Sequence, residues 1–201
     1  MSNNIDKIIY INLERRRDRK EQIEAELDRF NLSYERFNAI DYSSIVGCSK
    51  SHLEVLRLAK IRGYKNILIL EDDFIFLVSK ETFEQELDMF FKSGLDFDVC
   101  MISYSLLEDE EVPNFNHVRR VLNARTASGY IVNQSYYDKL IEIYEWAIPL
   151  LEQTGSHWLY ANDTSWEPLQ RRDKWYYFIN RIGKQKEGWS DNSNCFMKYD
   201  C

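Results

Sequence analysis

Ile67-Leu68-Ile69-Leu70 is followed at once by three acids, Glu71-Asp72-Asp73, and this stretch decides the fold. Four consecutive apolar residues are typical of a strand that is buried on both faces, as the inner strands of a mainly parallel sheet are. The three acids then stand at the carboxyl end of that strand, where open α/β sheets bind their ligands. The sequence therefore predicts an α/β domain with a ligand site beyond this strand.

The segments on either side alternate between strand and helix patterns. Strands are predicted at Ile8–Leu13, Tyr34–Ile40, Asp98–Ser103, Ala127–Val132 and near Tyr176–Ile179, and helices at Asp18–Phe30, Ser49–Arg62, Thr82–Phe91, Gln134–Trp146 and near Thr164–Arg171. The stretch after Ser103, through about Asn116, is polar and is assigned neither a strand nor a helix. This order predicts a Rossmann-like, mixed and mainly parallel central sheet with helices on both faces.

The totals restrict the class of protein. The chain has 201 residues, 44% of them hydrophobic, which fits a single domain over residues 1–201 with a continuous core. A net charge of −7 argues against a nucleic-acid partner. The sequence lacks an apolar run of roughly 18 residues, the length of a membrane-spanning helix, and its start lacks a signal-peptide layout. We therefore expect a cytoplasmic protein without a transmembrane segment, from a microbe or a virus.

The four cysteines are scattered through the chain. Cys48, Cys100, Cys195 and Cys201 form no CxxC pair and show no zinc-ligand spacing. This distribution predicts free thiols and argues against a metal held by sulfur.

The acidic tripeptide is the first candidate site. Adjacent carboxylates repel one another unless a cation or donor groups compensate. Mg²⁺ and Mn²⁺ prefer oxygen ligands and are often held by one or two carboxylates together with substrate phosphates. In an extended segment Glu71 and Asp73 point to the same side, so one of them can hold a metal while the other contacts water or a nucleotide sugar. The alternative is a solvated acidic turn, which the apolar residues before and after the acids disfavour.

Two further clusters open predicted helices. Asn12-Leu13-Glu14-Arg15-Arg16-Arg17-Asp18-Arg19 offers planar donors suited to a diphosphate, or else is only a solvated helix start. In Gly47-Cys48-Ser49-Lys50-Ser51-His52, Ser49 is the predicted helix cap, and Gly47 before it is expected to let a ligand approach backbone donors. An isolated histidine such as His52 is more often structural than a metal ligand.

Taken together, these segments resemble glycosyltransferase family 25, which includes bacterial lipooligosaccharide galactosyltransferases and collagen-modifying galactosyltransferases. The resemblance is carried, in family order, by Ile9-Tyr10-Ile11-Asn12-Leu13 with Arg16 and Arg19, Gly47-Cys48, Ser51-His52-Leu53, Ile69-Leu70-Glu71-Asp72-Asp73, Thr126-Ala127-Ser128-Gly129-Tyr130-Ile131-Val132, Gln185 and Ser190-Asp191. Two departures, Ser49-Lys50 after Gly-Cys and a short stretch between Ser103 and Arg125, concern the acceptor side.

The resemblance implies a GT-A type fold, a UDP-hexose donor (galactose or glucose), a Mn²⁺ or Mg²⁺ ion, and inversion at the anomeric carbon. It implies a glycan, lipid-linked sugar or hydroxylysine acceptor, and a role in glycan or lipopolysaccharide biosynthesis. Residues 1–103 would form the nucleotide-sugar donor half and residues 104–201 the acceptor half. The implied metal ligands are Asp73 and then Glu71, and the implied donor-site residues are Asn12, Arg16, Arg19, Gly47, His52, Glu71, Asp72 and Gln185.

Inversion requires a general base for the acceptor hydroxyl. Asp163 is the candidate, since it precedes a predicted helix and has Trp158, Tyr160 and Trp166 nearby to stack on a sugar. Its alternative role is a helix N-cap, and Asp191 is a rival for the base or for a further metal ligand.

Other classes of function use the same residues. A sugar-nucleotide hydrolase or a nucleotidyltransferase would need the same metal and arginines, and a non-catalytic carbohydrate-binding domain would need neither.

Overall fold

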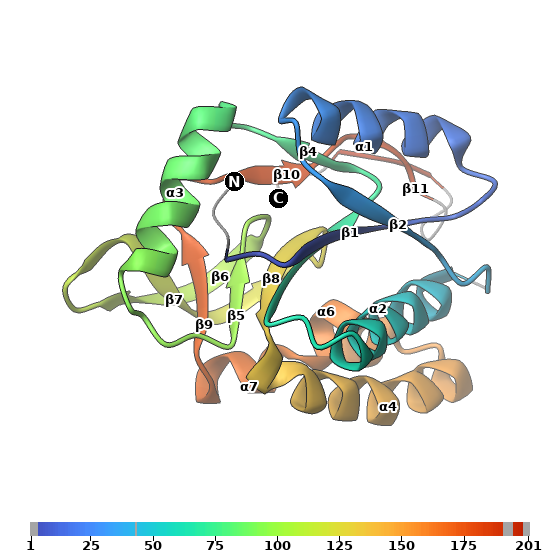
Figure 1. Ribbon diagram of the computed structural model, residues 1–201. Helices are drawn as coiled ribbons and strands as arrows, with labels where there is room; N and C mark the ends of the chain where they lie inside the picture. The colour runs from blue at the N-terminus through green and yellow to red at the C-terminus, as the bar shows by residue number, and fades with distance from the viewer. Residues whose placement is uncertain (1–3, 43, 191–194, 199–201) are drawn as a thin grey trace.

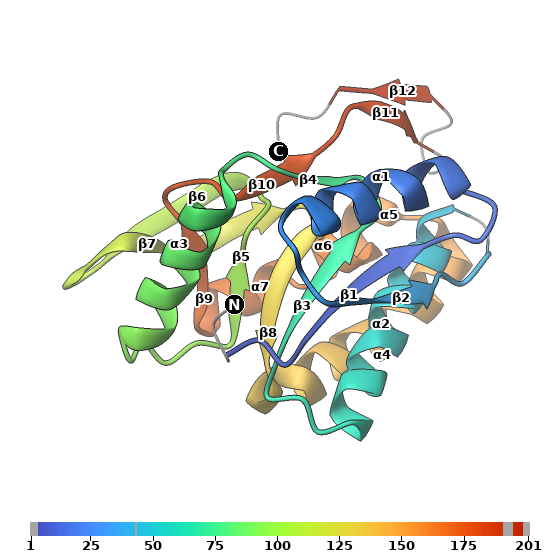
Figure 2. The same cartoon turned by 45° about the horizontal axis from the view of Figure 1, so that its top comes forward.

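The computed structural model describes residues 4–42, 44–190 and 195–198. An eight-stranded sheet with the order β2-β1-β3-β8-β5-β9-β7-β6 forms its centre (Figures 1 and 2). β8 and β7 run antiparallel to all the other strands of this sheet, which share one direction. Its strands are β1 (Lys7–Asn12), β2 (Tyr34–Asn38), β3 (Asn66–Glu71), β5 (Val99–Met101), β6 (Ser105–Val112), β7 (Phe115–Arg125), β8 (Gly129–Asn133) and β9 (Trp175–Phe178).

Two small antiparallel pairs lie outside the main sheet. β4 (Phe74–Phe76) pairs with β10 (Gly183–Gln185), and β11 (Gly188–Ser190) pairs with β12 (Cys195–Met197). The first pair joins the segment directly after the acidic tripeptide to the C-terminal part of the chain.

Helices cover both faces of the sheet. α1 (Arg17–Arg29) and α3 (Lys80–Lys92) lie on one face, and α2 (Ser44–Ile61) and α4 (Tyr137–Thr154) lie on the other (Figure 1). The remaining helices are short: η1 (Gln134–Tyr136), α5 (His157–Tyr160), α6 (Asn162–Ser165) and α7 (Glu167–Arg172). The predicted fold class, a mixed and mainly parallel sheet covered on both faces, is confirmed.

The apolar run of β3 serves two separate cores. Ile67 and Ile69 pack into the core under α2 and α4, whereas Leu68 and Leu70 pack into the core under α1 and α3. Side chains alternate between the faces of a strand, so a strand covered on both faces must be apolar at every position. All four residues are fully buried, which accounts for the pattern seen in the sequence.

The start of α2 differs from the prediction. The helix begins at Ser44 rather than Ser49, and the Ser49 hydroxyl donates to the Ile45 carbonyl instead of capping the helix. Gly47 therefore lies inside α2 rather than before it. A Cβ at Gly47 would lie 2.6 Å from the Ile40 carbonyl oxygen, so this glycine allows the chain before α2 to pack closely against the helix.

Two segments on the C-terminal side also differ from the prediction. α4 continues through Pro149 to Thr154, because Ile148 and Leu151 are buried in the core, and it ends at Gly155 with φ 68°. The polar stretch after Ser103 forms the hairpin of β6 and β7. Its acids pair across the hairpin with arginines of β7, as in the ion pair of Arg120 with Glu110 at 2.6 Å. β6 is an edge strand exposed to water, so its sequence is charged and lacks the apolar pattern by which a strand is predicted.

Among the described residues, none of the helices is both long enough and apolar enough to cross a membrane.

Gly183 offers a test of the packing that joins β10 to β4. A Cβ there would lie 2.2 Å from ring atoms of Phe74, whereas a Cβ at Gly188 would meet no heavy atom within 4 Å. Gly183→Ala is expected to lower the free energy of unfolding by about 1–3 kcal/mol, since overpacking forces neighbours apart. Urea unfolding measures the change. Gly188→Ala is the matched control, and equal effects of the two substitutions would contradict this packing.

Candidate functional site

A cleft opens beyond the carboxyl ends of β1 and β3. Ile11 of β1 lies opposite Glu71 of β3 in the strand register, which brings the loop after β1 beside the acidic tripeptide. The cleft is lined by Ile11, Leu13, Arg15, Arg16, Arg19, Ala39, Ile40, Tyr42, Gly47, Cys48, Ser51, His52, Glu71, Asp72, Asp73, Gln185 and Ser190. Most of the predicted donor-site residues therefore meet here, although they come from distant parts of the sequence.

Arg19 is the main cation beside the acids. Its Nη1 donates to Asp72 Oδ1 at 3.0 Å and to Asp73 Oδ2 at 3.1 Å, while its Nη2 donates to the Trp189 carbonyl at 2.6 Å. Arg19 was predicted to contact the nucleotide. The structure shows that it binds two carboxylates and ties β11 to them.

Asn12 is almost completely buried and forms a hydrogen bond with one of these acids, Asp72. Its Nδ2 donates to Asp72 Oδ2 at 2.8 Å and to the Arg16 carbonyl at 3.0 Å, and its Oδ1 accepts from Arg36 Nε at 3.1 Å. Asn12 does not line the cleft, so it orients Asp72. Its direct contact with a nucleotide stays a prediction.

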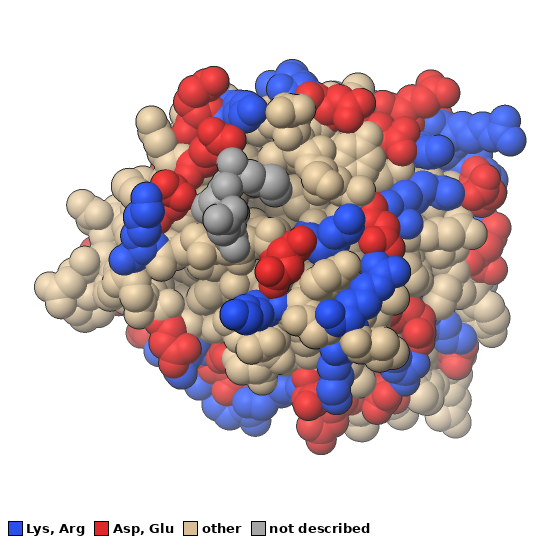
Figure 3. All heavy atoms as spheres, in the orientation of Figure 1, with Lys and Arg blue, Asp and Glu red and all other residues tan. Residues whose placement is uncertain are grey.

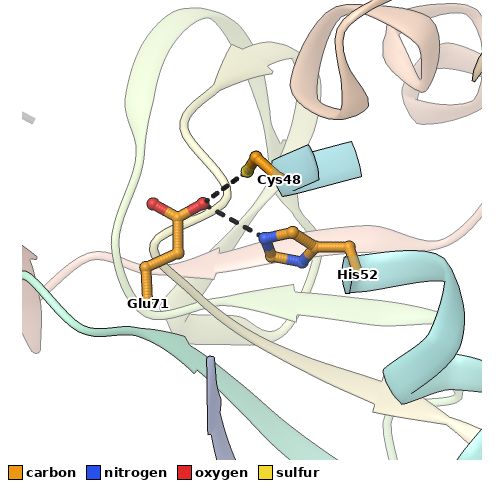
Figure 4. Close-up of side chains that lie close together, drawn as sticks. All are labelled: Cys48, His52 and Glu71. Carbon is orange, nitrogen blue, oxygen red and sulfur yellow. Dashed lines mark hydrogen bonds and ion pairs between the residues drawn. The ribbon is translucent and has the colours of Figure 1, made fainter. Parts of the chain in front are cut away.

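Glu71 is held from α2 by two side chains (Figure 4). His52 Nε2 lies 3.1 Å from Glu71 Oε1, and the Cys48 thiol donates to the same oxygen at 3.5 Å. Burial alone would raise the pKa of Glu71, but the hydrogen bonds from His52 and Cys48 outweigh it, and its pKa is lowered. Gln185 Nε2 approaches the other oxygen, Oε2, at 3.4 Å.

Cys48 is the site residue that sequence reasoning left without a role. Its i, i+4 spacing to His52 places both side chains on one face of a helix, and this signal depends on α2 starting before Ser49.

Asp73 is the least compensated of the three acids. Burial, together with the negative charge of Glu71, raises its pKa to about 7 despite the guanidinium of Arg19. Burial likewise raises the pKa of Asp72. Asp73 Oδ1 is buried and has no hydrogen-bond partner among the described residues. An unpaired buried carboxylate oxygen costs free energy, and a bound cation removes that cost.

These observations fit a hard divalent cation at Asp73. Asp73 Oδ1 would supply one oxygen ligand, and Glu71 Oε2, on the side of Gln185, would offer a second from the same cleft. The raised pKa of Asp73 reflects burial first and then the negative charges of Glu71 and Asp72, which the guanidinium of Arg19 offsets only in part.

Asp163 lies next to the cleft without lining it. Its Oδ2 accepts from the Thr126 backbone N–H at 3.1 Å, and burial raises its pKa, an effect that the charge of Glu71 increases. The residue is in the first turn of α6, where Ala161 is the N-cap, so the alternative role of Asp163 as a cap is wrong. Asp191, the rival base or ligand, lies outside the described residues.

Two of the aromatic residues near Asp163, Trp166 and Trp158, differ in exposure. Trp166 is completely buried against Tyr130 and Trp175, so its expected role as a platform for a sugar is wrong. Trp158 is 59% exposed and remains accessible to a ligand.

Charges on the face shown in Figure 3 are mixed, with Lys and Arg side chains interspersed among Asp and Glu. Arg15 pairs with Asp41, and Arg16 Nη2 pairs with Asp18 at 2.8 Å. The arginines at the cleft thus form local ion pairs.

No protein-family model matches the sequence, and no curated protein matches it either. Solved structures do. A197 from STIV shares 9% identity and a TM-score of 0.51, with 95% of this chain and 93% of that chain covered. The glycosyltransferase GlyE of Streptococcus pneumoniae TIGR4 shares 13% identity and a TM-score of 0.50, over 89% of this chain and 46% of that one. The chain has a GT-A type fold.

A mannose-1-phosphate geranyltransferase structure from Thermus thermophilus also matches, with 9% identity, a TM-score of 0.49 and 87% of this chain covered. The chain spans 59% of that structure's length and less than half of GlyE, although it spans nearly all of A197. The cleft at the carboxyl ends of β1 and β3 lies where ligands bind in open α/β sheets generally.

The raised pKa of Asp73 makes stability depend on pH when no metal is bound. Its pKa is about 7 in the folded chain and 3.8 in the unfolded one, so folding favours the protonated form. The stabilisation is complete below pH 3.8 and is lost as the pH rises to about 7. With a chelator present, Asp73→Asn is expected to raise the free energy of unfolding at about pH 8, by on the order of 2 kcal/mol, and to change it little near pH 4.

Urea unfolding at the two pH values measures this effect. Asp41→Asn removes an exposed carboxylate instead and serves as the control. A gain for Asp73→Asn that is the same at both pH values would show that Asp73 does not titrate as described.

Proposed function

We propose that this chain is a metal-dependent glycosyltransferase that transfers a hexose, galactose or glucose, from a UDP-sugar to a glycan, lipid-linked sugar or hydroxylysine acceptor. The observation that carries the proposal is the unpaired Oδ1 of buried Asp73, beside Glu71, in a cleft that arginines line. The GT-A type fold and its similarity to GlyE, a glycosyltransferase by name, support it. Asp73 and Glu71 would hold Mn²⁺ or Mg²⁺.

The arginines at the cleft would bind the donor diphosphate. Arg19 is occupied by Asp72 and Asp73, so this role falls to Arg15 and Arg16. Arg15 and its partner Asp41 are both exposed, and exposed ion pairs contribute only about 0–1 kcal/mol, whereas the mostly buried side chain of Arg16 pairs with exposed Asp18. Exchanging the ion pair of Arg15 with Asp41 for a diphosphate therefore costs little free energy, and bidentate pairing with phosphate oxygens is stronger.

Transfer with inversion is a single displacement at the anomeric carbon. The acceptor oxygen forms a bond to that carbon, the bond to the diphosphate breaks, and the acceptor hydroxyl loses its proton to a base. The divalent cation, when bound, neutralises the charge that develops on the leaving diphosphate. Asp163 suits the role of base, because burial raises its pKa toward the working pH and one of its oxygens is already fixed by the Thr126 N–H.

A nucleotidyltransferase would use the same acids and arginines, so the two reactions must be separated by their products. A hexosyltransferase releases UDP from a UDP-sugar as the new linkage forms, whereas a nucleotidyltransferase releases pyrophosphate from a nucleoside triphosphate and a sugar 1-phosphate. A hydrolase would yield free sugar whatever acceptor is added.

The direct test is to incubate the protein with UDP-, GDP- and CMP-sugars and Mn²⁺, and to measure the release of nucleotide with and without chelator. We expect turnover of a UDP-hexose that chelator abolishes. Asp73→Asn should reduce it by at least about a hundredfold, since it removes the principal metal ligand. Asp41→Asn is the control and should retain activity. Full turnover in chelator, with folded Asp73→Asn equally active, would falsify the proposed metal role.

The base is tested by separating binding from transfer. Asp163→Asn is expected to bind UDP with Mn²⁺ as the wild type does, measured by calorimetry, and to lose about 10²–10⁴-fold in transfer rate. Glu167→Gln, a nearby acid that pairs with Arg125 on the surface, is the matched control. Normal transfer by Asp163→Asn, together with its loss in Asp191→Asn, would assign the base to Asp191.

A further inference from the structure

Three side chains of different kinds converge at the floor of the cleft. Cys48 and His52 are one turn apart on α2 and point toward Glu71 at the end of β3 (Figure 4). Their ligand atoms, Cys48 Sγ, His52 Nε2 and a Glu71 carboxylate oxygen, all lie within 4.8 Å of one another. A thiol, an imidazole and a carboxylate are the donor set of a borderline-soft metal rather than of Mg²⁺ or Mn²⁺ alone.

We propose that Cys48, His52 and Glu71 form a binding site for a thiophilic divalent cation of the zinc class, separate from the hard-cation position at Asp73. The distances agree with this geometry. Around a tetrahedral zinc ion, ligand atoms at its usual bond lengths stand roughly 3.3–3.6 Å apart. Here Glu71 Oε1 is 3.1 Å from His52 Nε2 and 3.5 Å from Cys48 Sγ, and all three ligand atoms lie within 4.8 Å of one another.

The two oxygens of Glu71 face different neighbours. Oε1 faces Cys48 and His52, whereas Oε2 is approached by Gln185, which also reaches Asp73 Oδ2 at 3.5 Å. One carboxylate can therefore serve the soft site through Oε1 and the hard site through Oε2. The two positions are distinct and share a single residue.

His52 is oriented as a metal-bound histidine is. Its ring is fully buried, and its Nδ1 lies 2.7 Å from the Tyr130 hydroxyl, which directs Nε2 toward Glu71. Ligating histidines almost always use their second nitrogen in such a bond, which fixes the ring and its tautomer. Tyr130 is itself fully buried, so this support is rigid.

Asn162 is a further polar side chain beside the Cys48 sulfur. The side chain is buried, its Nδ2 has no hydrogen-bond partner among the described residues, and its Oδ1 lies 4.0 Å from Cys48 Sγ. The two ends of an amide are assigned from their surroundings. With the ends exchanged, Nδ2 would donate to a Cys48 thiolate, which satisfies the unpaired donor.

Binding is balanced in charge and protons. The Cys48 thiol releases its proton to solvent as sulfur bonds to the cation, while His52 binds as the neutral imidazole and Glu71 as the carboxylate. The cation also offsets the local excess of acids, because Arg19 reaches Asp72 and Asp73 and not Glu71. All three ligands line the cleft, so the fourth position opens toward it, as in sites that bind a water or a substrate oxygen.

The test uses Co²⁺ as a spectroscopic substitute for zinc in the full chain, after chelator treatment under reducing conditions. We expect one Co²⁺ per chain with a thiolate-to-cobalt charge-transfer band and the visible bands of a tetrahedral site. Cys48→Ala should lose the charge-transfer band. Cys100→Ala, which removes a buried thiol from the core under α1 and α3, should keep it. Asp73→Asn should also keep it, which separates this site from the proposed catalytic metal.

Tyr130→Phe tests the support of His52 without touching a ligand. It is expected to weaken Co²⁺ and Zn²⁺ binding by about 10–100-fold, as the loss of such outer contacts does.

A second measurement avoids substitutions in the buried site. Stoichiometric Zn²⁺ should slow the alkylation of Cys48 by at least about tenfold, followed residue by residue by mass spectrometry, and should leave exposed Cys195 unaffected. Absence of both the charge-transfer band and this protection would show that Cys48, His52 and Glu71 form a hydrogen-bonded cluster only. If the wild-type chain shows the charge-transfer band but does not turn over a sugar nucleotide, the result counts against the proposed function alone.

Discussion

The cost of holding three carboxylates side by side at the buried end of β3 is the constraint on which the site depends. Burial and mutual repulsion both oppose ionisation, and each acid is compensated by a different part of the chain. α2 supplies His52 and Cys48 to Glu71, the end of β1 supplies Asn12 to Asp72, and α1 supplies Arg19 to Asp72 and Asp73. Among the three acids, Asp73 keeps a buried oxygen without a partner in the described part of the chain, which makes it the place where a cation gains most.

The same constraint explains features of the fold that have no obvious role in the core. α2 has to start early enough for Cys48 and His52 to face Glu71, and Gly47 lets the preceding chain pack against that helix. The pairing of β10 with β4 brings Gln185 back to the acids from more than a hundred residues away in sequence. Arg19 binds β11 through the Trp189 carbonyl, and the C-terminal part of the chain lines the cleft together with the N-terminal strands.

The arginines near the cleft differ in the acids that they bind. Arg19 has a largely buried side chain between two acids, where removal would leave buried charges unpaired. Exposed Arg15 pairs with exposed Asp41, and Arg16, whose side chain is as buried as that of Arg19, pairs with exposed Asp18. A basic cluster that looks uniform in sequence thus contains one residue that binds the buried acids and two residues that pair with exposed acids.

The sequence by itself determined the layered fold and the edge of the sheet that carries the site. Continuous apolar runs at β1 and β3 can be buried only in a sheet covered on both faces, and acids directly after such a strand must lie at its carboxyl end. The sequence did not reveal the β6–β7 hairpin, whose charged edge strand lacks an apolar face, or the early start of α2. Only the tertiary structure decided which side chains meet. The grouping of Cys48 with His52 and Glu71, the burial of Trp166 and the engagement of Arg19 depend on contacts between distant segments, which local pattern and propensity do not encode.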